Sequence, residues 1–120
     1  MLKFPQKFFW GAATSSYQVE GNNSNADWWA WEKSFGKENS GAACRHYELY
    51  EQDFDLAKGL NHNAHRLSIE WSRIEPEEGK FSQKELQHYV DVIRALRARG
   101  QELRELAQAH QAGKDFEREC

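Results

Sequence analysis

Two short stretches of the chain carry the pattern of β-strands. The run over 8–15 begins with aromatic residues and ends with small ones, and it predicts a first strand. The run over 64–69 alternates, which predicts a second strand with two unlike faces. Arg66 and Glu70 share the polar face, whereas the opposite face carries Leu67, so the apolar face is expected to pack against helices.

Two longer stretches carry the pattern of amphipathic helices. The segment 45–58 is predicted to be helical, ended by Gly59, because apolar side chains recur there at spacings of three and four. Its stripe consists of Tyr47, Tyr50, Phe54 and Ala57, widened by Leu49 and Leu56. A second helix is predicted from a capping box over 82–85 to Arg99, closed by Gly100. Its buried stripe is expected to be Leu86, Tyr89, Val90, Ile93 and Leu96.

The order of these elements predicts a parallel sheet, and the pattern then changes. Strand, helix, strand and helix alternate with connections long enough for crossovers, which favours parallel strands. Between the first strand and the first long helix, Asp27 is expected to cap a short aromatic helical segment. Residues 101–120 are polar and helix-favouring, with only a thin apolar stripe. The sequence therefore predicts a βαβα unit over 1–100 and a divergent polar helical tail over 101–120.

Composition and charge exclude several classes of partner. The net charge is −3 with acidic and basic residues interspersed, so no nucleic-acid partner is expected. The sequence has no run near the ~20 apolar residues that span a bilayer and no hydrophobic core of a secretory signal, so no membrane partner is expected. Cys44 and Cys120 do not make a disulfide framework, which favours a reducing cytoplasm.

Histidines and a cysteine occur in pairs, but they do not predict a metal site. His62 and His65 lie where the chain enters the second strand, and Cys44 lies close to His46. Zinc needs three or four convergent ligands, and the spacing supplies no such set. Neither a metal nor another cofactor is expected.

Two motifs resemble a known family. The run Phe8-Phe9-Trp10-Gly11-Ala12-Ala13-Thr14-Ser15-Ser16-Tyr17-Gln18-Val19-Glu20-Gly21 resembles the N-terminal signature of the family 1 glycoside hydrolases. The block Ala64-His65-Arg66-Leu67-Ser68-Ile69-Glu70-Trp71-Ser72-Arg73-Ile74-Glu75-Pro76 is similar to the second strand of that family's barrel. The resemblance covers roughly residues 4–100. It implies an α/β fold, the N-terminal βαβα portion of a (β/α)8 TIM barrel, followed by a helical tail that does not match. Such a barrel needs about 250 residues.

The resemblance assigns roles to particular side chains. The residue matching Gln18 binds sugar hydroxyls in the family, and an amide can donate to one hydroxyl and accept from another. The other interpretation of Gln18 is an amide that caps strand backbone. Arg66 matches a residue inside the barrel near the nucleophilic carboxylate, and its alternative is an ion pair with Glu70. Glu70 and Trp10 are expected to support the site, and the five tryptophans either pack on sugar or fill the core.

The resemblance does not supply the reacting carboxyl groups. Retaining hydrolysis needs a pair about 5–5.5 Å apart, and in the family both are glutamates on later strands. The sequence contains no Asn-Glu-Pro motif. Glu20 and Glu70 lie near the ends of adjacent strands, but the two βα units do not build the walled cleft that such a pair needs. We therefore expect no catalytic residue in this chain.

Three interpretations of function follow. In the first, the chain is an N-terminal part of a retaining β-glucosidase that hydrolyses O-glycosidic bonds, inactive alone, with a β-glucoside or related small saccharide as its ligand. In the second it is a noncatalytic sugar-binding or scaffold module, and in the third it is one half of a split barrel. Because its strand edges would be exposed, the isolated chain is expected to self-associate through them, to be molten, or to rearrange into a compact α/β layer covered by the C-terminal helix. The preferred sugar, whether glucoside, galactoside or 6-phospho-glycoside, stays open.

Overall fold

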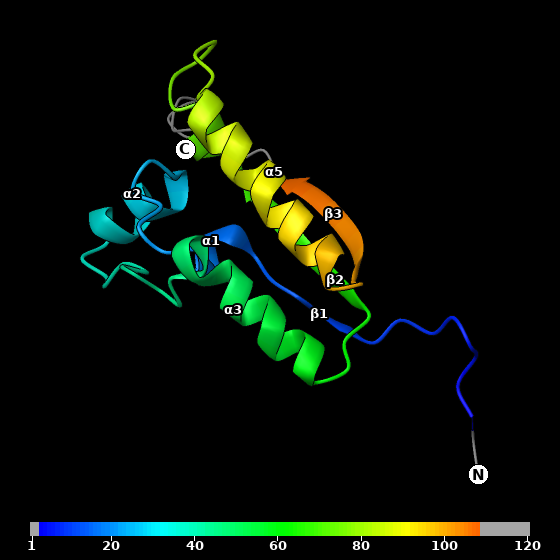
Figure 1. The fold of residues 1–120 in the computed structure, drawn as a ribbon. Helices are drawn as coiled ribbons and strands as arrows, with labels where there is room; N and C mark the ends of the chain where they lie inside the picture. Colours follow the sequence, from blue (N-terminus) through cyan, green and yellow to red (C-terminus); the bar gives the residue numbers. More distant parts are fainter. Residues whose placement is uncertain (1–2, 109–120) are drawn as a thin grey trace.

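The computed structural model describes residues 3–108 and consists of a small parallel sheet covered by helices on one face (Figure 1). Its elements are β1 (Gly11–Ala13), α1 (Ser16–Val19), α2 (Asp27–Ser34), α3 (His46–Gly59), β2 (Ala64–Glu70), α4 (Trp71–Ile74), α5 (Gln83–Ala98) and β3 (Glu102–Gln108). The strand order is β1-β2-β3, and both pairings are parallel. The predicted alternation of parallel strands and crossover helices is therefore confirmed.

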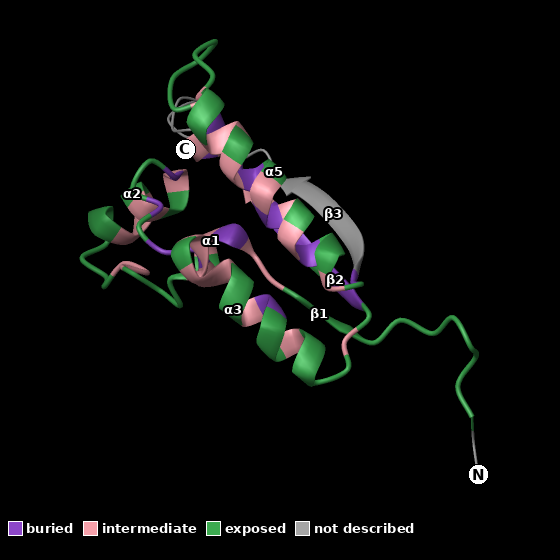
Figure 2. Cartoon of the chain, in the orientation of Figure 1, coloured by how far each residue is buried: buried purple, intermediate pink, exposed green. Residues whose placement is uncertain are grey.

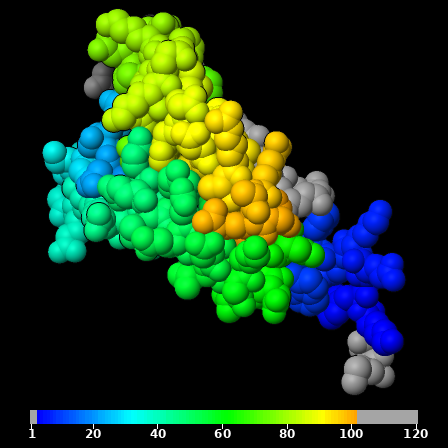
Figure 3. Space-filling view, in the orientation of Figure 1, coloured from blue at the N-terminus to red at the C-terminus, as the bar shows by residue number. Residues whose placement is uncertain are grey.

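The core lies between the sheet and the two long helices. Phe54 of α3, Leu67 of β2, and Val92 and Leu96 of α5 form one buried cluster. The alternation of the second strand is confirmed in part: Leu67 is buried in this cluster and Arg66 is exposed, but Ser68 and Glu70, on the same face as Arg66, are also buried. Both helices carry buried and exposed positions (Figure 2), and their surfaces adjoin in the space-filling view (Figure 3).

The predicted helical stripes are correct in part. Tyr50 and Phe54 pack as expected, but Leu56 is 69% exposed. On α5, Val92 takes the core position that the sequence pattern assigned to Val90, which is 40% exposed. The difference is one of helix rotation, because the stripe of Tyr89, Val92 and Leu96 keeps spacings of three and four.

The first strand is shorter than predicted. Only Gly11–Ala13 pairs with β2, and the chain then turns into the single helical turn of α1. Ser16 donates its backbone N–H to Oγ of Ser68 at 2.7 Å, so a side chain of β2 replaces the next strand partner. Gly11 is required by close approach, because a Cβ there would lie 2.0 Å from the carbonyl oxygen of Ala64.

Helix ends differ from the sequence prediction in detail. Ala26 rather than Asp27 is the N-cap of α2, and the Asp27 carboxylate accepts from the N–H of Trp28 at 2.7 Å. Ser82 caps α5 by accepting from the N–H of Glu85, as the capping box predicts. Gly100 follows α5 with a φ of 74°, the left-handed conformation expected of a residue that closes a helix.

The prediction of a helical tail is wrong for the part that the structure describes. Glu102–Gln108 forms β3, paired in parallel with the whole of β2 from Ala64↔Glu102 to Glu70↔Gln108. The local sequence favours a helix, but helix propensity is a weak preference that pairing with an open strand edge overrides. The remainder of the expected tail, 109–120, lies outside the described residues.

Candidate functional site

The candidate site lies where β1 and β2 end. Parallel strands place their carboxyl ends at one edge of a sheet. Ligands bind at that edge both in (β/α)8 barrels and in open α/β sheets. After β1 the chain forms α1, which carries Gln18, and Glu20 is its C-cap residue. After β2 it forms α4, whose N-cap is Glu70. Side chains from both connections therefore meet at the same edge.

Glu20 is buried and held by two other elements. Its side chain is 5% exposed, and Nε of Arg73 donates to Oε2 at 3.0 Å. Oε1 accepts from the hydroxyl of Tyr89 at 2.9 Å. Burial raises the pKa of Glu20 to about 7, although the bonds from Arg73 and Tyr89 favour the ionised form and act against this rise.

Glu70 is also buried, and its carboxylate is occupied by serines. Oε2 accepts from Oγ of Ser16 at 3.3 Å, and Oε1 accepts from Oγ of Ser72 at 2.8 Å. Oε1 also accepts from the N–H of Ser72, which is the N-cap bond of α4. The N–H of Glu70 donates to the hydroxyl oxygen of Tyr89 at 3.1 Å. Glu70 thus fixes the start of α4 and the position of Ser16.

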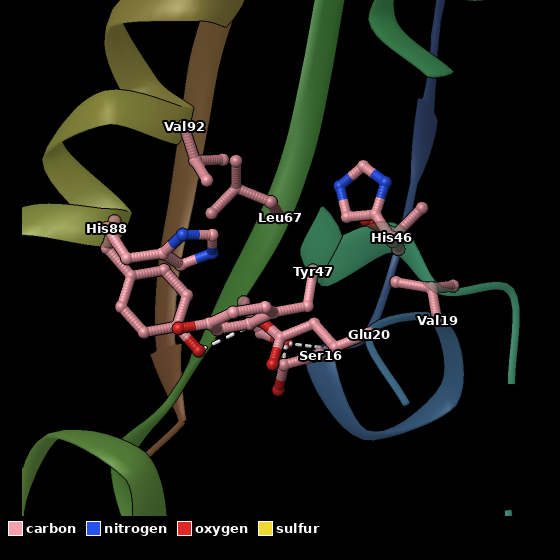
Figure 4. Close-up of a pocket in the computed structure, with 11 residues that line it drawn as sticks. Ser16, Val19, Glu20, His46, Tyr47, Leu67, His88 and Val92 are labelled. Carbon is pink, nitrogen blue, oxygen red and sulfur yellow. Dashed lines mark hydrogen bonds between the residues drawn. The ribbon is translucent and has the colours of Figure 1, made fainter. Parts of the chain in front are cut away.

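A small hollow lies beside Glu20, between the first turn of α3 and the middle of α5 (Figure 4). Its walls include His46 and Tyr47 of α3 and His88 of α5, and the rings of Tyr47 and His88 stack at 3.8 Å. Its volume of about 10 Å³ is room for about one water molecule. A sugar ring does not fit there, so a saccharide would have to bind at the exposed edge.

Of the predicted site residues, Gln18 and Glu70 lie at this edge. Gln18 is exposed on α1, within one helical turn rather than on a strand. Its alternative role of capping strand backbone is therefore not what the structure shows. Glu70 lies beneath the edge, 3% exposed.

The other two predicted residues lie elsewhere. Trp10 immediately precedes β1, at the opposite end of the strand from Gln18, and its ring packs against Phe4 and Phe8 at centroid distances of 4.7 and 4.8 Å. Arg66 is exposed on the face of β2 opposite the core. Within residues 3–108 it makes no ion pair with Glu70, so that alternative is not observed. The supporting roles of Trp10 and Arg66 stay predictions.

The sequence reasoning missed Arg73 and Tyr89. Arg73 Nη2 donates to the carbonyl oxygen of Gly21 at 2.6 Å and also to Oδ1 of Asn23. Its guanidinium lies over the ring of Tyr47 at 4.4 Å. An arginine three residues beyond a strand that ends in glutamate is a sequence signal that could have been read. The sequence contains no comparable signal for Tyr89, because its position on an apolar stripe indicates only that it is buried.

Most tryptophans are not core residues. Trp28 is 53% exposed and stacks on Trp31 at 4.8 Å, and Phe35 continues the row at 5.1 Å. The link between α2 and α1 is polar, since the hydroxyl of Tyr17 donates to Glu32 at 2.7 Å. The segment after β2 forms the short helix α4, and Nε1 of Trp71 donates to Glu75 at 2.7 Å.

Metal and membrane sites have no support in the described part of the chain. Within residues 3–108, no group of three or more His, Cys, Asp or Glu side chains gathers as metal ligands would. The helices there are also too short or too polar to cross a bilayer.

Comparison with known proteins identifies the family. The model of Glycosyl hydrolase family 1 matches residues 1–103. A 1,4-β-D-glucan glucohydrolase of Thermotoga neapolitana is 37% identical over 106 residues, which are 80% of this chain and 25% of that protein. Among solved structures, a β-glycosidase from Pyrococcus horikoshii has a TM-score of 0.80 and 48% identity, covering 87% of this chain and 25% of its own.

A third relative is a β-glucosidase from Thermotoga maritima in complex with deoxynojirimycin, with a TM-score of 0.83 and 32% identity over 92% of this chain and 28% of its own. The structural relatives are (β/α)8 barrels, and this chain spans about a quarter of their length. The fold described here corresponds to a part of that barrel. The chain belongs to Glycosyl hydrolase family 1 and matches its N-terminal part.

Proposed function

We propose that this chain supplies the N-terminal part of the sugar-binding site of a β-glucosidase-like barrel. Alone, it does not hydrolyse glycosides. The observation that carries the proposal is the exposed Gln18, on a helical turn at the carboxyl edge of the sheet. Its amide is free to reach a neighbouring pair of sugar hydroxyls, one as donor and one as acceptor. A β-glucoside or a related small saccharide is the ligand, as the deoxynojirimycin complex of the relative suggests.

The burial of the two nearby glutamates supports the absence of hydrolysis. A retaining glycosidase needs one carboxylate that attacks the sugar and one carboxyl that protonates the leaving group. Glu20 and Glu70 are 5% and 3% exposed, and both oxygens of each accept hydrogen bonds from protein groups. Neither is therefore available to a sugar, and both reacting carboxyls would have to come from elsewhere in a complete barrel.

The alternative of one half of a split barrel is favoured by the open sheet. Among residues 3–108, β1 and β3 each have only β2 as a strand neighbour. A strand edge with unpaired backbone groups is a template for further strands. A second chain that supplies the remaining strands would pair there, and in its absence the chain would self-associate.

The cytoplasmic location expected from the two separated cysteines also stays a prediction.

Hydrolysis of an aryl β-glucoside by the purified chain tests the catalytic part. We expect no turnover by the wild type. Turnover that is lost on Glu20→Gln or Glu70→Gln would overturn the proposal, because it would show that a buried glutamate reacts. Turnover that survives both substitutions would instead indicate a complementing or contaminating chain.

Binding of deoxynojirimycin tests the sugar-binding part. We expect a weak saturable change in the NMR spectrum that Gln18→Ala abolishes and Gln87→Ala retains. Gln87 is a matched control, because it is an exposed glutamine whose amide donates to Asp91 on the outside of α5. Binding that is unchanged in Gln18→Ala would rule out the role assigned to Gln18.

A further inference from the structure

The helical turn that carries Gln18, α1, is too short to be stable without contacts to the rest of the protein. α1 contains four residues, and the side chain of its N-cap residue Ser15 makes no capping hydrogen bond. A single turn of helix in water is unstable, because its nucleation fixes many dihedral angles for few hydrogen bonds. Contacts from outside the turn must therefore keep it in place.

The C-terminal end of α1 is held by Glu20, whose carboxylate joins two distant segments. Arg73 reaches Oε2 from α4 at 3.0 Å, and Tyr89 reaches Oε1 from α5 at 2.9 Å. The two partners lie 53 and 69 residues from Glu20 along the sequence. We infer that Arg73, Glu20 and Tyr89 form a clamp that fixes α1 and, through it, the position of Gln18.

Arg73 extends the clamp to the backbone beyond α1. Its Nη2 donates to the carbonyl oxygen of Gly21 at 2.6 Å, next to the residue that its Nε binds. A planar guanidinium makes such parallel contacts at fixed spacing, whereas a lysine ammonium does not. Arg73 thus holds the C-terminal end of α1 at two points, the side chain of Glu20 and the carbonyl group of Gly21.

The clamp is itself anchored in the rest of the fold. The guanidinium of Arg73 lies over the ring of Tyr47, whose hydroxyl donates to Glu85 at 2.8 Å. The hydroxyl oxygen of Tyr89 accepts from the N–H of Glu70, the last residue of β2. These contacts connect α1 to α3, α5 and the end of β2, so the position of Gln18 follows the position of the sheet.

The clamp lies at the margin of the hydrophobic core, since Tyr89 is buried on the same face of α5 as Val92 and Leu96. The core cluster of Phe54, Leu67, Val92 and Leu96 contains none of its three residues. A substitution in the clamp should therefore loosen α1 more than it loosens the sheet. If Gln18 binds a sugar as proposed, Arg73 is a positioning residue, since it acts on the sugar only through Gln18.

Amide hydrogen exchange by NMR on the full chain tests this inference, using Arg73→Lys and the matched control Arg99→Lys. Arg99 also pairs with a carboxylate, its Nε donating to Asp55 at 2.6 Å, but it joins α3 to the end of α5. In Arg73→Lys we expect the amides of Val19 and Glu20 to exchange at least about tenfold faster, with the β2 amide of Leu67 unchanged. We also expect the side-chain amide resonances of Gln18 to move. Arg99→Lys should do neither.

Two results would overturn the clamp. One is unchanged exchange of the α1 amides in Arg73→Lys, and the other is faster exchange of α1 and β2 by the same factor, which would indicate general destabilisation. Tyr89→Phe is the second variant if Arg73→Lys does not fold. Because it also lowers global stability, we expect the amides of Val19 and Glu20 to accelerate by a larger factor than the amide of Leu67, and equal factors would overturn the clamp.

The effect of the clamp on sugar binding rests on the proposed function of Gln18. A failure of that function can be distinguished from a failure of the clamp. If deoxynojirimycin shifts the Gln18 amide in the wild type, we expect its affinity to fall at least about tenfold in Arg73→Lys, and equal affinity would overturn the positioning of Gln18. If the wild type shows no shift, the sugar-binding proposal fails, while the exchange experiment still decides whether the clamp fixes α1.

Discussion

Tyr89 donates its hydroxyl proton to Oε1 of Glu20 across 2.9 Å, which joins α5 to the residue that ends α1. The hydroxyl oxygen of Tyr89 in turn accepts from the N–H of Glu70 at the end of β2. Burial raises the pKa of Tyr89 well above its ordinary value, and the neighbouring Glu20 charge adds to the rise. The hydroxyl therefore stays protonated and links the two βα connections that form the site.

Removing this hydroxyl should destabilise the fold. In Tyr89→Phe, Glu20 and the N–H of Glu70 each lose a partner in a buried place, so we expect the free energy of unfolding to fall by about 1–3 kcal/mol. Urea unfolding measures it. Tyr50→Phe is the control, since Tyr50 packs on the core through its ring, and a change below about 0.5 kcal/mol is expected there. Equal effects of the two substitutions would show that the Tyr89 hydroxyl has no special role.

The buried Glu20 should make stability depend on pH. Its pKa is about 7 in the fold against an ordinary value of 4.5, so the folded chain binds the proton more tightly than the unfolded chain. The stabilisation from this proton is complete below about pH 4.5 and is lost as pH rises through about 7. We expect the free energy of unfolding to fall by up to roughly 3 kcal/mol between pH 4.5 and 8 because of this group.

Glu20→Gln isolates that contribution. Burial lowers the pKa of His65 and of His88, so their contributions are lost as pH falls and act in the opposite direction. The difference between wild type and Glu20→Gln cancels these histidine effects. A difference that does not change over this pH range would contradict a raised pKa at Glu20.

The order and face of the main elements could be predicted from local sequence. The alternation over 64–69 placed Leu67 toward the helices, and the apolar spacing around Phe54 placed α3 on that face. β3 could not be predicted in this way. Its residues favour a helix, and only the open edge of β2, which is a feature of the folded sheet, makes the segment Glu102–Gln108 a strand.

The candidate site could be predicted only where a motif carried it. The first motif indicated Gln18, and the structure places this residue exposed at the expected edge. The partners of Glu20 could not be found, because Arg73 and Tyr89 lie 53 and 69 residues away and meet Glu20 only through the crossovers of the fold. Trp10 lies in the same motif as Gln18, yet the direction of β1 places the two at opposite ends.

The turn after Glu20 should tolerate no side chain at Gly21. Its φ is 86°, and a Cβ there would lie 2.0 Å from the carbonyl oxygen of Ala42. Gly36 also has a positive φ, 63°, but a Cβ there would meet nothing within 4 Å among the described residues. Both alanine variants carry the conformational strain, of about 1 kcal/mol. We expect thermal unfolding to show Gly21→Ala at least about 2 kcal/mol less stable than Gly36→Ala, and similar losses would contradict the clash.

The open edge of β1 should drive self-association of the isolated chain. Gly11–Ala13 pairs with β2 on one side and has no strand neighbour on the other within residues 3–108. A lysine on an edge strand opposes edge-to-edge pairing, because its charge would have to be desolvated or placed beside a second copy. We expect sedimentation to show a mean mass that rises with concentration for the wild type and less steeply for Ala13→Lys. Ala30→Lys, at an exposed position of α2, adds the same charge away from the edge and should behave as wild type. A concentration-independent monomer for the wild type, or equal effects of the two lysines, would show that the β1 edge does not mediate association.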